Sequence, residues 1–259
     1  GVGDSSKPRP GGLAGTGPFF ARFQRSSPIS RMHPAIRASC LALALALVNP
    51  AMAVAEEAAA PPAAAVDLLP QGQEVADTVI ELAGWVVATR DSEGYPFAIM
   101  DKAAAQILVF GGDGRLRGAA PALFGSAVGD HIAPGIAGLA LREIPGKDRT
   151  TPAGRFVGGF GPSLDAGRVL WVDYDSGVSI HPTATGVRSE KRAERLASPQ
   201  PDDNRITHGC INVAPEFYGQ VIEPVFARGG VFYILPETKP LAEVFPEFAQ
   251  GRDTAQRSE

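Results

Sequence analysis

The segment THGCIN, residues 207–212, places a histidine, a glycine and a cysteine side by side. Both types are rare in this chain, which has two cysteines and four histidines. A cysteine attacks a carbonyl as its thiolate, which needs a nearby base or positive charge, and the resulting oxyanion needs backbone N–H donors. The segment therefore predicts a nucleophile, Cys210, against the bland alternative of a small buried thiol.

Two histidines are candidates for the base that takes the proton of this thiol. His208 lies two residues before the cysteine, where a bending loop seldom turns the ring toward the sulfur. His181 ends a predicted strand, which is a rigid place for a base, so we assign it as the general base. His131, in the loop-like VGDHIAPGI, is expected to be a solvated residue.

Gly209 is expected to let the backbone approach a substrate closely. The N–H groups of Gly209 and Cys210 would then point at one oxygen and hold the oxyanion. Two histidines and a cysteine could instead bind zinc, but no Cys-x-x-Cys or His-x-x-x-His spacing supports such a site. We therefore predict no metal.

Three segments, in the same order, resemble the L,D-transpeptidase family with its YkuD-type catalytic domain. THGCIN is similar to the family's Ser/Thr-His-Gly-Cys, which is followed by an apolar residue and Asn or Arg. TPAGRF (151–156) is similar to its Thr-Pro-x-Gly-x-Phe/Tyr segment, and AIMDKAAAQILVFGGDGRL (98–116) resembles its opening hairpin. The resemblance covers residues 96–237.

The resemblance implies a cofactor-free enzyme that remodels peptidoglycan and so serves cell-wall biogenesis. Cys210 would be acylated by the third residue of a peptide stem, with loss of D-Ala and with His181 as base. A second stem, an outer-membrane lipoprotein or water would then resolve the thioester. A hydrolase of the same links and a non-catalytic wall-binding domain are the alternatives.

The remaining site residues surround the nucleophile in the sequence. Thr207, His208 and Gly209 are interpreted as oxyanion and supporting residues, and Asn212 as a substrate-binding residue. Arg205 is interpreted as a clamp for a substrate carboxylate, against the alternative of a surface charge.

Two features depart from the family pattern. The 25 residues between His181 and Thr207 exceed the usual spacer, and the excess is the charged GVRSEKRAERLASPQPDDNR (186–205). This insertion is predicted to form a helix over 189–196 and to cover the cleft as a lid that governs access. Pro182 stands where some members have Ser, but its carbonyl can still orient the imidazole.

The resemblance implies a mainly β, sandwich-like fold with a few helices, and the local patterns agree. Apolar residues at helical spacing predict a helix over 73–88, in an N-terminal segment 73–94. From residue 96 short apolar runs between Gly, Pro and Asp predict strands, with turns at FGGDGRL and YDSGVSI. APEFYGQVIEPVFA is expected to be helical, with Pro224 kinking or ending it. The expected catalytic domain is 95–240, followed by a tail, 241–259.

Met32 opens a predicted signal peptide, 32–53, in which Arg37 precedes an apolar run. A spanning helix needs about 20 apolar residues, whereas this run ends at Asn49-Pro50, so no membrane anchor is expected. Cys40 lies in front of the run, where it cannot be a lipidated residue at the cleavage site. Residues 1–31 are interpreted as a disordered leader or an over-long start, and 54–72 as a low-complexity linker.

The predicted mature chain is acidic and is expected to be periplasmic or associated with the cell wall. Residues 1–53 hold six of the 24 Lys and Arg and one of the 28 Asp and Glu, which leaves 18 − 27 = −9. This charge argues against nucleic acid as a partner, because phosphate contacts need clustered Lys and Arg. Cys210 would be its one cysteine.

Overall fold

The computed structural model describes residues 65–69, 73–163, 167–183 and 188–256. The predicted leader and signal peptide, residues 1–53, lie outside these ranges, as do 54–64 of the predicted linker. Within the described ranges, no helix is long and apolar enough to cross a membrane.

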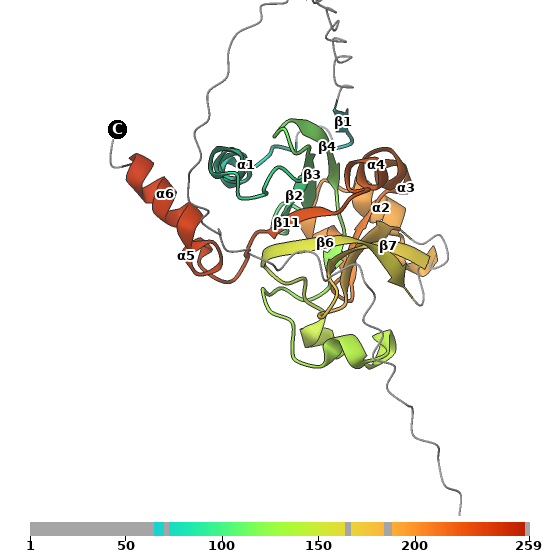
Figure 1. The fold of residues 1–259 in the computed structure, drawn as a ribbon. Coiled ribbons are helices and arrows are strands. Elements are labelled where there is room, and N and C mark those ends of the chain that lie inside the picture. The colour runs from blue at the N-terminus through green and yellow to red at the C-terminus, as the bar shows by residue number, and fades with distance from the viewer. Residues whose placement is uncertain (1–64, 70–72, 164–166, 184–187, 257–259) are drawn as a thin grey trace, which may run out of the picture. The chain divides into compact units, whose positions relative to one another are not determined.

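The described strands form one large, nearly closed sheet in the order β1-β4-β3-β2-β11-β6-β7-β8-β10, with a separate pair β5-β9 (Figure 1). The mainly β class is thus confirmed, but the two sheets of the expected sandwich are continuous. The strands are β1 (Val66–Asp67), β2 (Phe97–Asp101), β3 (Gln106–Phe110), β4 (Leu116–Pro121), β5 (Phe124–Gly125), β6 (Gly154–Ser163), β7 (Gly167–Asp173), β8 (Val178–Pro182), β9 (Arg205–Thr207), β10 (Ile211–Val213) and β11 (Gly230–Ile234).

Strand β6 makes the sheet continuous because it pairs with different strands along its length. Residues 154–158 pair with β11, and residues 159–163 pair with β7. A Cβ atom on Gly158 would lie 1.9 Å from the carbonyl oxygen of Trp171. Glycine therefore allows the backbones of β6 and β7 to approach where the pairing changes.

Strands β2, β3 and β11 are buried on both faces, which explains their unbroken apolar runs. Alternate residues contribute to two cores. The inner core includes Ala98, Met100, Ile107, Phe232 and Ile234, together with residues of β7, β8 and β10. The outer core includes Phe97, Ile99, Leu108, Val231 and Tyr233, together with residues of the N-terminal and C-terminal helices.

The N-terminal helix is confirmed as α1 (Asp77–Thr89), four residues shorter at its start than the apolar pattern predicts. Its buried side chains, Val79, Leu82 and Val86, pack on the outer face of the sheet. The chain leaves the helix through Arg90, whose φ of 58° is left-handed. The C-terminal segment is also helical, as α5 (Leu241–Val244) and α6 (Pro246–Gln256). Phe248 of α6 packs against Trp85 of α1.

The predicted turns and the helix after the cysteine are present. Gly111 and Arg115 close the turn between β3 and β4, where Gly111 N donates to the Arg115 carbonyl at 2.9 Å. The helix runs as α3 (Pro215–Phe217), a π turn (Tyr218–Ile222) and α4 (Glu223–Val225). The wider π turn ends two residues before Pro224, which lacks the N–H that an α-helix requires.

One expectation, about the predicted linker, is corrected. Val66 and Asp67, inside the predicted linker, form β1 and pair with Gly118 and Ala119 of β4. Tyr174 contacts Trp171 edge to face, and 67% of it is exposed. It follows the last residue of β7, so strand alternation no longer fixes its direction.

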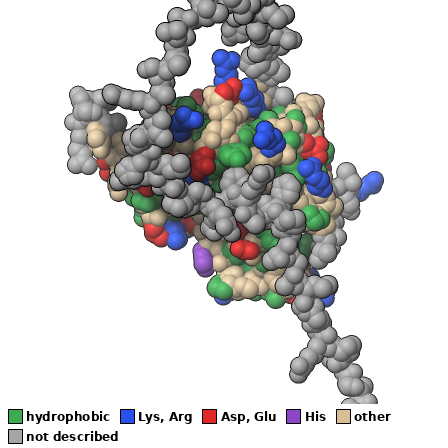
Figure 2. Space-filling model, viewed as in Figure 1, with side chains coloured by type: hydrophobic (Ala, Val, Ile, Leu, Met, Phe, Trp, Pro, Cys, Tyr) green, Lys and Arg blue, Asp and Glu red, His purple; other side chains and the backbone are tan. Residues whose placement is uncertain are grey.

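On the face in Figure 2, basic and acidic side chains are interspersed.

Candidate functional site

The register between β8 and β10 brings the predicted base and the THGCIN segment together. The strands are parallel, with Ile211 opposite Ile180 and Asn212 opposite His181. Both isoleucines are completely buried in the inner core. Because side chains alternate along a strand, the polar residues on either side of each isoleucine share the opposite face. The patterns Ser179-Ile180-His181 and Cys210-Ile211-Asn212 therefore place four polar side chains together.

Cys210 is a free, half-buried thiol, and the side chain of His181 is close enough to lower its pKa. Its Sγ also lies 3.6 Å from the Ser179 hydroxyl and 3.6 Å from the Gly177 carbonyl oxygen. Burial raises the pKa of the thiol, but hydrogen bonds from His181 and Ser179 outweigh burial and bring the pKa below its usual value. The surroundings of Cys210 thus favour the thiolate that a nucleophile requires.

The imidazole of His181 is oriented by the carbonyl of Pro182, which lies 3.0 Å from Nδ1. A carbonyl can only accept a hydrogen bond, so this contact requires the proton on Nδ1. Nε2 is then the nitrogen that can accept the thiol proton. Proline at position 182 supplies the orienting carbonyl, as the sequence predicted.

Asn212 lies against the face of this imidazole. Its Nδ2 is 3.0 Å from Nε2 and 3.4 Å from Nδ1 of His181. An amide nitrogen in the ring plane and in line with one lone pair would lie much farther from the second ring nitrogen. The side chain is completely buried. This placement favours a role in holding the base over the substrate-binding role assigned from the sequence.

The loop that carries Cys210 is held by Thr207. Its hydroxyl donates to the Cys210 carbonyl at 2.6 Å and accepts from the Gly209 N–H at 3.2 Å. The backbone of Gly209 has φ of 128°, and an added Cβ would lie 2.8 Å from the Thr150 carbonyl oxygen. The position therefore requires glycine. Since the Gly209 N–H is already engaged, the N–H of Cys210 remains the predicted oxyanion donor.

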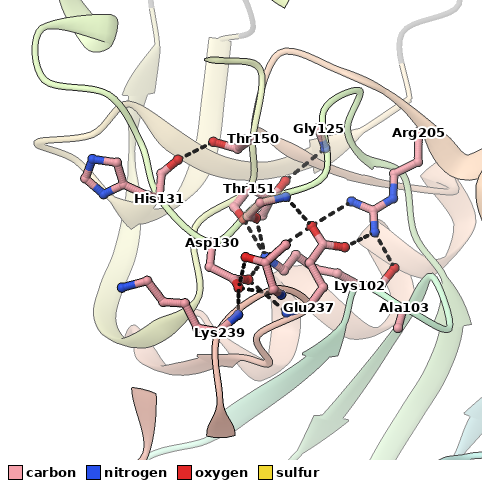
Figure 3. Close-up of polar contacts among 12 residues, drawn as sticks. Lys102, Ala103, Gly125, Asp130, His131, Thr150, Thr151, Arg205, Glu237 and Lys239 are labelled. Atoms are coloured by element: carbon pink, nitrogen blue, oxygen red, sulfur yellow. Dashed lines mark hydrogen bonds and ion pairs between the residues drawn. The ribbon is translucent and has the colours of Figure 1, made fainter. Parts of the chain in front are cut away.

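Thr151, the first residue of TPAGRF, contacts the same loop, a role that sequence analysis did not assign. Its hydroxyl donates to the Gly209 carbonyl at 2.9 Å and accepts from the Gly125 N–H at 2.9 Å. Its own carbonyl accepts from Lys102 Nζ at 2.8 Å. Thr151 thus links the cysteine loop to a buried charge cluster (Figure 3).

This charge cluster is centred on Lys102 and Asp130, whose side chains are 0% and 1% exposed and lie 2.7 Å apart. Asp130 also accepts the backbone N–H groups of residues 237, 238 and 239, as Figure 3 shows in part. Burial raises the pKa of Asp130, but the hydrogen bonds from Lys102, Thr238 and the backbone bring it well below its ordinary range. The cluster fastens the segment after β11 to β2 and to the loop before β6.

Arg205 belongs to this cluster. Its guanidinium forms an ion pair with Glu237, and Nη2 donates to the Lys102 carbonyl at 3.0 Å (Figure 3). Its side chain is 13% exposed. With these donors committed inside the protein, the position favours a structural role over the clamp for a substrate carboxylate proposed from the sequence.

The other two described histidines, His208 and His131, are not among the groups that shift the pKa of Cys210. Burial and the nearby Arg149 lower the pKa of His208 below its ordinary value of 6.5, which favours the neutral ring at pH 7. His131 is exposed, and its carbonyl accepts from the Thr150 hydroxyl. Among the residues the structure describes, no group of three His, Cys, Asp or Glu side chains could hold a metal ion.

No protein-family model matches the chain. No curated protein matches it either. Solved structures similar to it include an L,D-transpeptidase from Mycobacterium smegmatis, with 18% identity and a TM-score of 0.34 over 54% of this chain and 58% of that one. The helical cell shape determining protein Pgp2 from Campylobacter jejuni has 17% identity and a TM-score of 0.39, over 56% of this chain and 49% of that one. The catalytic domain of an E. faecium L,D-transpeptidase has 16% identity and a TM-score of 0.31, over 53% and 95%. The chain spans less than two thirds of the first two proteins, and similarity at this level assigns no activity.

Proposed function

We propose that this protein is a cysteine acyltransferase of the L,D-transpeptidase type that acts on peptidoglycan peptide stems. The observation that carries the proposal is the order Cys210 Sγ, His181 imidazole, Pro182 carbonyl. This order gives a thiol with a lowered pKa, a base beside it and an acceptor that fixes the proton of the base on Nδ1. The sequence resemblance supplies the substrate class.

In the proposed acylation, the Sγ–H proton moves to Nε2 of His181. The sulfur bonds to the carbonyl carbon of the third stem residue, and the carbonyl electrons move to oxygen, facing the N–H of Cys210. When the C–N bond breaks, the imidazolium returns its proton to the amine of the leaving D-Ala. A thioester on Cys210 and a neutral His181 remain.

In the proposed second half, an acceptor amine gives its proton to His181 and attacks the thioester carbon. The C–S bond then breaks, and the leaving Cys210 sulfur takes the proton back from His181. A second stem would give a 3-3 cross-link, and an outer-membrane lipoprotein would become attached to the wall. Water would give L,D-carboxypeptidase activity. These reactions require the protein to be exported, as the predicted signal peptide provides.

Intact-protein mass spectrometry after incubation with a carbapenem tests the acyl-enzyme. We expect one covalent adduct on the wild type and none on Cys210→Ala, which should also lose turnover of a tetrapeptide stem while keeping its unfolding midpoint. Chelators should change neither result. A wild type with neither adduct nor turnover would overturn the proposal in favour of a non-catalytic wall-binding domain.

A further inference from the structure

We propose that Arg192, in the insertion between base and nucleophile, is a positioning residue that acts on His181 through Asn212. The inference rests on the proposed function for its catalytic meaning, although the contacts stand by themselves. It gives the insertion a part in the chemistry, whereas the sequence suggested a lid that governs access.

The insertion is ordered around Arg192 where the structure describes it. It comprises a 3-10 turn (Arg188–Glu190), helix α2 (Arg192–Ala197) and a second 3-10 turn (Pro201–Asn204). The predicted helix over 189–196 is thus split in two at Lys191, whose φ of 49° is left-handed. This break turns the side chain of Arg192 toward the site, where it is only 14% exposed. Its neighbours Lys191 and Glu194 point to solvent, with 66% and 72% exposed.

The guanidinium of Arg192 is held at both ends. Its Nε donates to Glu190 Oε2 at 2.6 Å, and its Nη1 donates to Asn212 Oδ1. Glu190 is held in turn, because Arg195 donates from Nε to the Glu190 carbonyl at 2.8 Å. Arg195 also donates from Nη1 to the Asp203 carbonyl at 2.5 Å, which joins the two ends of the insertion.

The contact with Arg192 decides which end of the Asn212 amide faces the imidazole. A guanidinium has only donors, so the amide must present its oxygen to Arg192. The NH₂ group then faces the ring of His181, as the 3.0 and 3.4 Å contacts show. Without Arg192, either end of the amide could lie against the ring.

The imidazole is therefore held in three directions. The Pro182 carbonyl holds Nδ1 in the ring plane, the thiol of Cys210 faces the ring from the neighbouring strand, and the Asn212 amide covers one face. Rotation about χ2 would break the first two contacts, and the amide opposes that rotation. If the imidazole tilts, Nε2 no longer points at the thiol proton. Small misplacements of reacting groups lower the rate strongly.

The test compares two arginines of α2 that both bind within the insertion. Arg192→Met removes the contacts with Asn212 and Glu190. The matched control Arg195→Met loosens Glu190 and Asp203 but leaves the direct contact between Arg192 and Asn212 in place. We expect Arg192→Met to slow both iodoacetamide alkylation of Cys210 and acylation by a carbapenem by roughly ten- to a hundred-fold. Arg195→Met should change either rate less than about three-fold. Equal losses in the two variants would overturn the proposal.

A spectroscopic measurement separates positioning from stability. In wild type, ¹⁵N NMR of the His181 ring should report a proton on Nδ1, whereas Arg192→Met should show a mixture of tautomers. Arg192→Lys keeps a charged donor and should recover part of the alkylation rate. A single unchanged Nδ1–H tautomer in a folded Arg192→Met would refute the inference. If Arg192→Met does not fold, Arg192→Lys still decides, because full loss of rate with an unchanged tautomer would also refute it.

Iodoacetamide makes failure of this inference distinguishable from failure of the proposed function. It needs a thiolate but no peptide-binding site. If the wild type is not acylated by a carbapenem but its alkylation depends on Arg192 and not on Arg195, the positioning role stands and the transpeptidase function fails. If the wild type is acylated by a carbapenem and Arg192→Met does not change the rate, the transpeptidase function stands and the positioning role fails.

Discussion

Ser179 and Cys210 lie side by side on adjacent segments of the sheet, with the serine hydroxyl 3.6 Å from the cysteine Sγ. The side chain and the backbone N–H of Ser179 both lower the pKa of the thiol, against the effect of burial. Substitution by alanine removes the hydroxyl and leaves the backbone donor in place. Substitution of Ser179 therefore tests how much its hydroxyl lowers the pKa of Cys210.

Ser179→Ala should raise the pKa of Cys210, because one hydrogen bond to the thiolate is lost. The midpoint of the alkylation rate against pH should move upward relative to wild type. Ser198→Ala, whose hydroxyl bonds Asp203 in the insertion, is the control and should leave the midpoint in place. A midpoint that stays fixed in Ser179→Ala would contradict the assignment.

His181→Ala should slow acylation by about a hundred-fold or more, which is the range expected for a positioned general base. His208→Gln should cost less, since a neutral ring that only makes hydrogen bonds can be replaced in part by an amide. Single-turnover acylation by a carbapenem measures both. If His208→Gln abolished acylation and His181→Ala did not, the base would be misassigned.

Asp130→Asn should lower the free energy of unfolding at pH 7 by about 1.5–3 kcal/mol, because buried Lys102 loses its nearer carboxylate and keeps only Glu237, at 3.5 Å. The matched control is Asp113→Asn, which breaks an exposed pair with Arg117 and should cost less than about 1 kcal/mol. Urea unfolding of the three proteins at pH 7 measures the difference. Similar losses in both variants would mean that the buried cluster does not stabilise the fold.

The Lys102–Asp130 pair predicts how the free energy of unfolding depends on pH. The pKa of Asp130 is lower in the folded than in the unfolded chain, so its contribution is present above the ordinary value of 3.8 and declines as pH falls below it. The gap in unfolding free energy between wild type and Asp130→Asn should therefore narrow below about pH 4. A gap that stays constant down to pH 2 would argue against an ionised Asp130.

Gly209→Ala should impair the cysteine loop, because φ of 128° and the Thr150 carbonyl 2.8 Å from the new Cβ both oppose a side chain. The strain is on the order of 1–3 kcal/mol, seen as a lower unfolding midpoint or as a loop that shifts and acylates slowly. The control is Gly219→Ala, where nothing lies within 4 Å of an added Cβ. Normal acylation and an unchanged midpoint in Gly209→Ala would contradict this view of the loop.

The local patterns of the sequence predict the elements well, because alternation and turn residues act over a few positions. FAIMD and QILVF become β2 and β3, and the Asp-Gly signal lies in the turn that follows β3. Strand order depends on contacts between distant segments. Local patterns therefore did not predict that β6 pairs with β11 along one half and with β7 along the other, which makes the sheet continuous. They also did not predict that residues 66–67 add an edge strand.

The site was predictable where chemistry is concentrated in one residue type. Cys210 and His181 are rare residues, and the structure brings them together. Ser179 and Thr151 are common residue types that act through single hydrogen bonds, although the shared pattern of SIH and CIN was a usable signal for Ser179. Arg192 had no signal, since its role depends on how the insertion folds back over Asn212. The sequence around Arg205 does not show that its charge is paired, because its partner Glu237 lies 32 residues later.

Strand β11 lies between β2 and β6, yet it is the last strand of the sheet in chain order. A ribosome or a secretion channel releases a chain from its N-terminus, so the two halves of the sheet lack their common neighbour until residue 234 has emerged. Non-local pairing of this kind is slow and comes late in folding. The unpaired edges of both halves are therefore exposed to proteases and holding chaperones until β11 has emerged. The order of the strands thus delays completion of the sheet that carries His181 and precedes Cys210 until β11 has joined its two halves.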